Sequence, residues 1–288
     1  MFRDTKAAMW FVLPAFVFLC VFKLWPITLS FAESFMQATI SGKRYFVGLE
    51  NYIYLLCDDP VFWGSVKVTL MYALIINPLA VIISLSLALL LNRGGRHIEF
   101  FRTVAFLPSA ISMSVVAVIW SVMLDPHYGL INSILRMFGM SPQPFLTSSS
   151  QALWCLIALS LWRSSGYWMM FFLAGLQGIP HEVYEAAEID GARGLTRTLR
   201  ITLPLLARTT SFVLVSNTAF NFLTFAPVFI LTRGGPMGST NMLMYESYKS
   251  AFVNVDLGRA TAISSLLLVV ILIISFVQLR LTRANFEY

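Results

Sequence analysis

The sequence predicts an all-α membrane protein with six transmembrane helices and with both termini in the cytoplasm. Three observations lead to this fold class: the composition, the lengths of the apolar runs, and the distribution of Lys and Arg. Of the 288 residues, 58% are hydrophobic and 12% are charged, whereas a soluble globular domain is roughly 45–50% apolar and about 25% charged. Lipid must therefore be the solvent for much of the chain, and we expect residues 1–288 to form a single transmembrane domain.

A helix that crosses the bilayer needs about 20 mainly apolar residues. Six segments meet this requirement, and they are approximately Ala7–Leu29, Val68–Leu91, Thr103–Leu124, Ala152–Leu176, Leu203–Leu231 and Leu257–Leu281. The first of them, residues 7–29, could also be a secretory signal because Arg3 and Lys6 precede it. Its apolar run is longer than the roughly 7–15 residues of a signal core, which favours a first transmembrane helix.

Positive charge is shared unevenly between the two alternating sets of connecting segments. One set holds 11 basic residues: Arg3, Lys6, Arg93, Arg96, Arg102, Arg193, Arg197, Arg200, Arg208, Arg280 and Arg283. The other set holds seven: Lys43, Arg44, Lys67, Arg136, Arg233, Lys249 and Arg259. Because Lys and Arg accumulate in cytoplasmic loops, the first set is predicted to be cytoplasmic.

The remaining composition excludes several classes of function. The formal charge of +6 does not indicate nucleic-acid binding, because the basic residues lie between apolar runs and not on a soluble module. The three cysteines and three histidines show no disulfide or metal-ligand spacing, so we expect no metal site. Nor do we expect any catalytic residues.

The segment 178–204, between the fourth and fifth predicted spans, has the pattern of a helix, a turn and a second helix. Pro180 suits a first helical turn, and Glu182 and Glu185 follow where the helix dipole favours anions. Gly191 can adopt the left-handed conformation that ends a helix. On physical grounds alone the segment is either a well-capped re-entry loop or a cytoplasmic knob with a small, flat alanine surface.

Seven residues of this segment resemble the EAA signature of binding-protein-dependent ABC importer permeases, E-A-A-x3-G-x9-I-x-L-P. They are Glu185, Ala186, Ala187, Gly191, Ile201, Leu203 and Pro204. The resemblance implies a type I ABC importer permease fold over a core of residues 66–281. It also implies that residues 178–204 form a coupling loop, whose helix sits in a groove of an ATPase subunit.

Motifs in the outer loops are similar to one branch of this family, the permeases for sugars and glycerol phosphate. They are Phe46–Tyr52, Asp125–Pro126, Gly129–Asn132 and Thr232–Pro236, and they are typical of the first permease subunit of the maltose, lactose and glycerol-phosphate type. The resemblance implies a permease in the bacterial cytoplasmic membrane that imports an oligosaccharide or disaccharide. A glycerol-phosphate importer is the alternative.

The chain has no G-x4-G-K-[ST] phosphate-binding loop. ATP and magnesium are therefore expected on separate subunits, with no cofactor in this chain and no enzyme activity of its own. The resemblance implies four partners besides lipid: two ATPase subunits, a second homologous permease, and an extracellular or periplasmic solute-binding protein.

Polar residues inside predicted spans are functional candidates because lipid penalises them. Asn217, Asn221 and Thr224 are spaced by four and three residues, which places them on one face of a helix. They could line the substrate path, where amides suit sugar hydroxyls, or they could make interhelical hydrogen bonds.

Arg163 lies near the middle of the fourth predicted span, with Tyr167 four residues later, and both are further candidates for the substrate path. A charge at this depth must face protein or a water-filled cavity. Arg163 could bind an anionic substrate, or it could pair with a carboxylate or with carbonyl groups of the second permease, and the structural role is favoured. Asn77-Pro78 in the second span is interpreted as a kink.

Two other functions remain open. An ion-coupled secondary transporter would need intramembrane carboxylates or broken helices around an ion site, and no predicted span has a central Asp or Glu. A membrane-embedded enzyme would need a cluster of nucleophiles, acids or metal ligands at one depth, and the sequence shows none.

Overall fold

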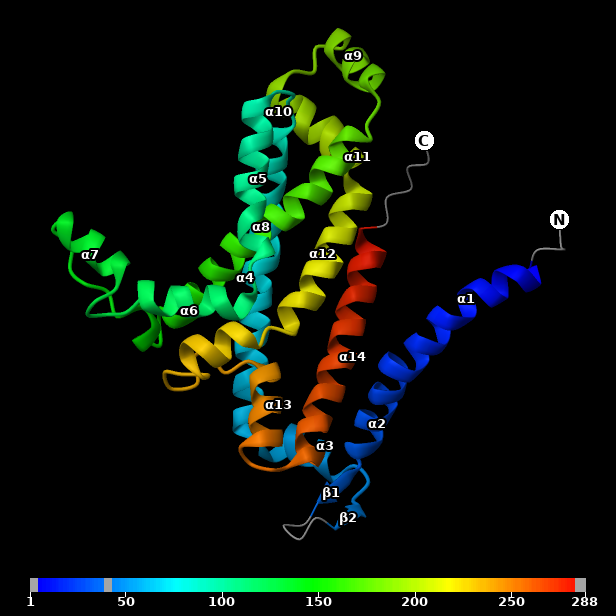
Figure 1. Ribbon diagram of the computed structural model, residues 1–288, viewed down its shortest axis with the longest axis vertical. Helices are drawn as coiled ribbons and strands as arrows, with labels where there is room; N and C mark the ends of the chain where they lie inside the picture. Colours follow the sequence, from blue (N-terminus) through cyan, green and yellow to red (C-terminus); the bar gives the residue numbers. More distant parts are fainter. Residues whose placement is uncertain (1–4, 39–42, 283–288) are drawn as a thin grey trace. The chain divides into compact units, whose positions relative to one another are not determined.

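The computed structural model of the chain describes residues 5–38 and 43–282, which are mostly helical (Figure 1). Arg3 and Arg283, which contribute to the predicted charge bias, lie outside the described residues. Contacts divide the chain into two compact units, Met1–Trp63 with Glu246–Leu268, and Gly64–Tyr245 with Val269–Tyr288. The long helices α4 (Pro60–Leu91) and α14 (Leu257–Leu281) each contribute to both units.

The first unit contains the N-terminal helix and a small hairpin. Its elements are α1 (Thr5–Leu19), a π-helical turn (Cys20–Leu24), α2 (Trp25–Glu33), β1 (Met36–Ala38), β2 (Arg44–Phe46), α3 (Glu50–Ile53), a π-helical turn (Tyr54–Asp58), the end of α13 (Leu243–Phe252), and the start of α14. The strands pair antiparallel with Met36 opposite Phe46. They are a small departure from the predicted all-helical class.

Charged side chains are buried in this first unit. Asp59 caps α4, because its Oδ1 atom accepts hydrogen bonds from the backbone N–H groups of Val61 (2.9 Å) and Phe62 (3.2 Å). The Oδ2 atom of Asp59 accepts a hydrogen bond from the Arg259 guanidinium, which also lies 3.6 Å from Glu246. Both carboxylates are buried. The pairing of Asp59 with Arg259 could not be predicted locally, because 200 positions separate the two residues.

The second unit holds the rest of the helices. They are most of α4, α5 (Arg96–Ala110), α6 (Met113–Met123), α7 (Leu130–Met137), α8 (Ala152–Gln177), α9 (His181–Ile189), α10 (Gly194–Arg197), α11 (Leu203–Leu205), α12 (Ala207–Phe222), the start of α13 and the end of α14. Short 3₁₀ or π-helical turns lie at Phe145–Thr147, Thr198–Thr202 and Val228–Thr232.

Within the described residues, three helices are long and apolar enough to cross a membrane: Met9–Glu33, Pro60–Leu91 and Leu257–Leu281. The count reaches five if each of two bent helix pairs is one span. Helix α8 has the predicted position and 26 residues, but it is not among these candidates because Arg163 and its serines reduce its hydropathy. A mostly helical membrane protein is therefore supported, while the crossing number of six stays a prediction.

The third predicted span is not one continuous helix. It is made of α5 and α6, which meet at a bend of 95°. Pro108 lies in the last turn of α5, where it removes a backbone N–H group. Ile111 follows in an extended conformation, with ψ at 141°. The prediction of one helix over residues 103–124 was wrong. The run of apolar residues does not reveal the break, because the carbonyl groups freed there accept hydrogen bonds from another helix.

The fifth predicted span is also broken. The segment Gly194–Leu205 is bent by 70° relative to α12, and α12 ends at Phe222. Residues 224 and 225 are non-helical, and the chain becomes helical again before the turn Val228–Thr232. The prediction of a continuous helix over residues 203–231 was therefore wrong.

Helix α8 is the centre of the second unit, and its buried side chains pack with α4, α12 and the α11–α12 junction. This core consists of Ala88, Trp168, Met169, Phe172, Leu173, Leu176, Ile179, Leu206 and Val213. At Gly166, the backbone of α8 meets α5 so closely that a Cβ atom would lie 1.8 Å from the Ala105 carbonyl oxygen. Small residues permit such approaches between helices in membranes.

Candidate functional site

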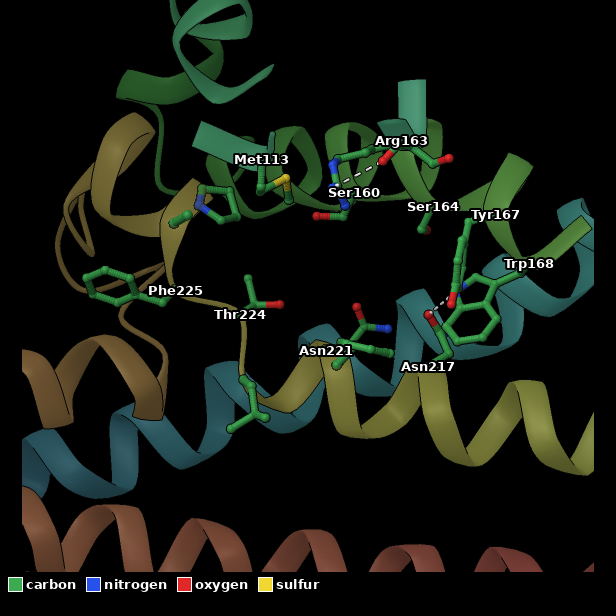
Figure 2. Close-up of a pocket in the computed structure, with 15 residues that line it drawn as sticks. Met113, Ser160, Arg163, Ser164, Tyr167, Trp168, Asn217, Asn221, Thr224 and Phe225 are labelled. Carbon is green, nitrogen blue, oxygen red and sulfur yellow. Dashed lines mark hydrogen bonds between the residues drawn. The ribbon is translucent and has the colours of Figure 1, made fainter. Parts of the chain in front are cut away.

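A pocket of about 540 Å³ lies in the second unit, between α8 and the end of α12 (Figure 2). Its lining residues are Ser109, Met113, Ser160, Arg163, Ser164, Tyr167, Trp168, Asn217, Phe220, Asn221, Leu223, Thr224, Phe225, Ala226 and Pro227. All five residues that were predicted to line a substrate path are on its wall. Its size is within the range of small-molecule sites.

Three asparagine side chains form a buried cluster at one end of the pocket. The Oδ1 atom of Asn77 on α4 accepts hydrogen bonds from the Nδ2 groups of Asn217 (2.9 Å) and Asn221 (2.7 Å). Trp168 Nε1 donates to Asn217 Oδ1 at 2.8 Å. The interhelical alternative thus holds for both asparagines, and Asn77, interpreted from the sequence as part of a kink, is the acceptor that joins them. Helix α4 continues through Pro78.

Besides joining this cluster, Asn221 can contact a ligand in the pocket. Its Oδ1 atom makes no hydrogen bond to any residue that the structure describes, and it is not among the buried unpaired atoms. An amide oxygen with this geometry can accept a hydrogen bond from a hydroxyl group. Figure 2 shows the Asn221 side chain beside the cavity, with Asn217 farther along α12 against Trp168. Asn221 is therefore suited to contact a ligand, whereas Asn217 mainly positions its neighbours.

We expect Asn77→Leu to destabilise the protein by roughly 1–3 kcal/mol, because it leaves two buried amide donors without their acceptor. The matched control is Ser84→Ala on the same helix. The Ser84 hydroxyl is buried but has no hydrogen-bond partner in the described part of the chain, so its removal should be neutral or slightly stabilising. Thermal unfolding of the purified protein measures both changes. Equal destabilisation by the two variants would contradict the cluster's role.

Arg163 binds the broken helix pair of the third span. Its Nε and Nη2 groups donate to the Ile111 carbonyl oxygen at 3.2 and 3.1 Å, and Nη2 also lies 3.5 Å from the Ser109 carbonyl oxygen. Both carbonyl groups lie at the C-terminal end of α5, where the helix dipole favours a cation. Arg163 thus pairs with carbonyl groups of this chain, while the predicted pairing with a second permease stays a prediction.

Aromatic rings form much of the pocket wall. Tyr167 and Trp168 meet edge to face with ring centroids 4.9 Å apart, and Trp168 lies 6.1 Å from Phe220. Phe220 is 65% exposed and Tyr167 is 39% exposed, so both offer free ring surface. Thr224 lies past the end of α12 and still lines the pocket, although it is not on the helical face predicted for it.

The predicted coupling loop has the helix–turn–helix form expected from its sequence. Helix α9 begins after Pro180 and ends at Ile189, and Gly191 follows with φ at +77°. The N–H group of Ala192 donates to the Ala187 carbonyl oxygen (2.8 Å), and that of Gly191 donates to the Glu188 carbonyl oxygen (3.1 Å). This pair of hydrogen bonds is a Schellman cap, which confirms the helix-ending role predicted for Gly191.

The exposed surface of α9 differs from the predicted alanine surface. Ala186 is exposed, but Ala187 is buried against the protein. Two apolar side chains instead project beside the Gly191 turn, Ile189 at 87% exposed and Leu195 at 73%. Neither residue was predicted to be part of the coupling surface, although an isoleucine in a loop that is predicted to be cytoplasmic was a usable signal.

The rest of the predicted coupling loop packs against other residues of the second unit. Tyr184 lies beneath the Arg197 guanidinium, 5.5 Å from the ring centroid, and Val183 and Tyr184 pack against the core around α8. Three further residues of the signature are half-buried: Ile201 precedes α11, and Leu203 and Pro204 lie within it. Figure 1 shows α9 at the end of this unit, beyond the ends of α5 and α8.

The outer-loop motif around Asp125 is a turn. Asp125 Oδ1 accepts the backbone N–H groups of Tyr128 and His127, each at 2.8 Å, and these bonds hold the pKa of the carboxyl below its ordinary value. The turn is therefore supported at neutral pH and weakens only as the pH falls through that lowered pKa. A Cβ atom on Gly129 would lie 2.4 Å from the Asp125 carbonyl oxygen, which explains the glycine. Among the described residues, no group of His, Cys, Asp or Glu could hold a metal ion.

Comparison with known proteins agrees with the resemblance of residues 185–204 to the EAA signature. Residues 76–286 match the family model of the binding-protein-dependent transport system inner membrane component. The sn-glycerol-3-phosphate transport system permease protein UgpA of Agrobacterium fabrum is 36% identical over 283 residues, covering 96% of this chain and 94% of that protein. A probable ABC transporter permease protein of Pyrococcus horikoshii is 34% identical over 270 residues, covering 92% and 91%.

The fold is similar to that of a chain in a solved bacterial alginate ABC transporter, crystallised in complex with an alginate pentasaccharide-bound periplasmic protein. The TM-score is 0.83 at 22% sequence identity, over 98% of this chain and 95% of the other. At this identity the likeness concerns the fold alone. With the family match across most of its length and relatives that are permeases, this chain belongs to the binding-protein-dependent inner membrane components, the permease family of ABC importers.

Proposed function

We propose that this permease imports a carbohydrate, an oligosaccharide or disaccharide, across the bacterial cytoplasmic membrane by alternating access. The observation that carries the proposal is the pocket beside α8, whose wall combines hydroxyl and amide groups with exposed aromatic rings. Sugars present hydroxyl groups at their edges and apolar faces to aromatic rings. Glycerol phosphate is the second candidate substrate, and it is favoured by the 36% identity to a glycerol-3-phosphate permease.

The membrane arrangement that we propose has six crossings with both termini in the cytoplasm. The excess of Lys and Arg on the side of the 178–204 loop supports it. In this arrangement α5 with α6 forms the third crossing and α8 the fourth. Buried helix breaks are tolerated in membranes where protein satisfies the freed backbone groups, as Arg163 does here.

The proposed assembly contains two ATPase subunits, a second homologous permease and a solute-binding protein outside the membrane. ATP and magnesium would be bound by the ATPases. The contact with an ATPase is assigned to α9, the turn after it and the start of α10, where Ala186, Ile189 and Leu195 present exposed apolar surface. Glu185, Gly191 and the half-buried Ile201, Leu203 and Pro204 would hold this surface in position. Closure of the ATPases would then rock the permeases between two access states.

We expect Gly191→Val to abolish copurification of the ATPase subunits, or to reduce ATP-dependent uptake by at least tenfold. The β-branched side chain cannot adopt the left-handed conformation without strain, so the cap after α9 is lost. Gly139→Val is the matched control. Gly139 has φ at +72° and ends α7 with the same pair of hydrogen bonds, from Gly139 to Arg136 and from Met140 to Leu135.

The two variants should suffer similar strain, but only Gly191→Val should release the ATPase subunits. Retention of the ATPases and of uptake in Gly191→Val, at normal protein levels, would reject the coupling role. Uptake into membrane vesicles separates the importer from an ion-coupled transporter. Uptake should follow the supply of ATP and persist when the ion gradients are collapsed.

A further inference from the structure

The pocket contains a single charged side chain, and it is a cation. Arg163 is the only Asp, Glu, Lys or Arg among the residues that line the pocket. In the described parts of the second unit, every carboxylate lies in an end or a loop, at Glu99, Asp125, Glu182, Glu185, Glu188 and Asp190. Arg163 takes part in none of the ion pairs found among the described residues. No carboxylate that the structure describes therefore neutralises its charge.

The Arg163 guanidinium is held in one position, and one of its nitrogen atoms is free to bind a ligand. Nε and Nη2 donate to the carbonyl groups of Ile111 and Ser109, which fixes the plane of the group. Nη1 makes no hydrogen bond to any described residue and is not among the buried unpaired atoms, so it is available from the pocket. A fixed guanidinium with free N–H groups matches the oxygens of a carboxylate or a phosphate.

The opposite wall is complementary to the rest of such a ligand. Figure 2 shows Arg163 on the α8 side of the cavity, across from Asn221 and Thr224. The free Oδ1 atom of Asn221 suits a hydroxyl group, and the exposed ring of Phe220 suits an apolar face. The carbonyl groups at the end of α5 stabilise the guanidinium through the helix dipole, but they carry no full negative charge. A charge in a membrane interior is retained at a cost, and no described carboxylate in this unit pairs with Arg163. The uncompensated charge therefore points to the ligand.

We propose that Arg163 determines specificity for an anionic substrate, a sugar or polyol that carries a carboxylate or a phosphate group. This proposal rests on the proposed import function and names the substrate class of that same pocket. The negative group binds at the free side of the guanidinium, and the hydroxyl groups face Asn221. A neutral sugar would leave the charge unpaired and would bind more weakly.

The charge of the pocket can be measured before any substrate is known. In the assembled transporter, Cys20, Cys57 and Cys155 are replaced and one cysteine is introduced by Phe220→Cys. Its rates of modification by an anionic and a cationic methanethiosulfonate reagent are compared with those of a cysteine from Ser149→Cys, an exposed loop position whose sequence neighbours are uncharged. The anionic-to-cationic rate ratio should be roughly tenfold higher in the pocket than on the loop, as for one uncompensated charge at partial screening.

Variants of Arg163 show which residue is responsible. Arg163→Gln should reduce the ratio in the pocket to the value on the loop, and Arg163→Lys should retain most of it. A ratio in the parent pocket equal to that on the loop would overturn the proposal, even if Arg163→Gln fails to assemble. A high ratio that Arg163→Gln leaves unchanged would also overturn it, because the charge would then come from elsewhere.

Protection of the same cysteine identifies the anion. Glycerol 3-phosphate, glucuronate and glucose are added at increasing concentration. At least one of the two anions should protect at roughly tenfold lower concentration than glucose, and this advantage should disappear in Arg163→Gln. Phosphate and carboxylate ligands are distinguished by which of the two anions protects. Preferential protection by glucose would overturn the proposal.

ATP-dependent uptake by the parent protein that retains Phe220, with the native cysteines replaced, is measured in parallel. If ATP-dependent uptake shows no preference for anionic substrates, only the specificity role of Arg163 is rejected. If the pocket prefers anions but the transporter shows no ATP-dependent uptake, the proposed import function is rejected instead.

Discussion

Gly166→Ala is expected to destabilise the protein by about 1–3 kcal/mol or more, although alanine is the better helix former. In a helix interior, the change from glycine to alanine ordinarily stabilises by up to about 1 kcal/mol. At Gly166, the added Cβ atom would lie 1.8 Å from the carbonyl oxygen of Ala105 and 2.5 Å from its carbonyl carbon. Both atoms belong to the backbone of α5, so α5 and α8 must move apart, which has the cost of an overpacked core.

The matched control is Gly64→Ala at the start of α4. No heavy atom lies within 4 Å of the Cβ position at Gly64, so this variant should be neutral or more stable. Thermal unfolding of the two purified variants is the measurement. The close packing of α5 on α8 would be disproved if Gly166→Ala were as stable as Gly64→Ala.

The separation of α5 from α8 should also disturb the pocket. Arg163 lies on α8 one turn before Gly166, and it reaches the carbonyl groups at the end of α5. We therefore expect the Gly166→Ala variant to lose the fixed position of the guanidinium along with its stability. The two effects have one physical cause, the distance between the helices.

Arg259→Met is expected to destabilise the first unit by roughly 3–5 kcal/mol. Arg259 lies between two buried carboxylates: the side chain of Asp59 is 3% exposed and that of Glu246 is 2% exposed. Removal of the guanidinium leaves Asp59 without its charged partner in a poorly solvated place. Lys249, 3.1 Å from Glu246, still compensates that second carboxylate, which limits the loss.

The control for this prediction is Arg44→Met, which removes the same chemical group from the Arg44–Glu33 pair. The two side chains of that pair are 53% and 30% exposed, and exposed pairs contribute about 0–1 kcal/mol. Denaturant or thermal unfolding in detergent measures both variants. Similar losses from the two would mean that burial does not determine the strength of the Arg259 pair.

Much of the architecture was predictable because lipid demands long apolar runs. The fourth and sixth predicted spans agree with α8 and α14 to within one residue. The helix of the coupling loop and its ending at Gly191 were predictable because capping is local chemistry, readable within a few residues. The helix breaks in the third and fifth predicted spans were not predictable. Mean hydropathy is averaged over many residues, so it hides the few at which α5 and α12 end.

The residues of the pocket were predictable as a set but not in their roles. Lipid penalises polar side chains, which identified Arg163, Asn217 and Asn221 from the sequence alone. Their partners are distant in sequence: Asn77 is 140 residues from Asn217, and Ile111 is 52 residues from Arg163. Asn77 was therefore interpreted as part of a kink, and Arg163 was expected to pair with another subunit.

By itself, the sequence determined the class of this protein, its family resemblance and the capped helix of its coupling loop, because each depends on composition or on residues near one another. Only the tertiary structure decided which polar groups are consumed by internal hydrogen bonds and which remain free in the pocket. The reason is that hydrogen bonds between helices are set by how closely the backbones approach, and at Gly166 that approach depends on a carbonyl group 61 positions away.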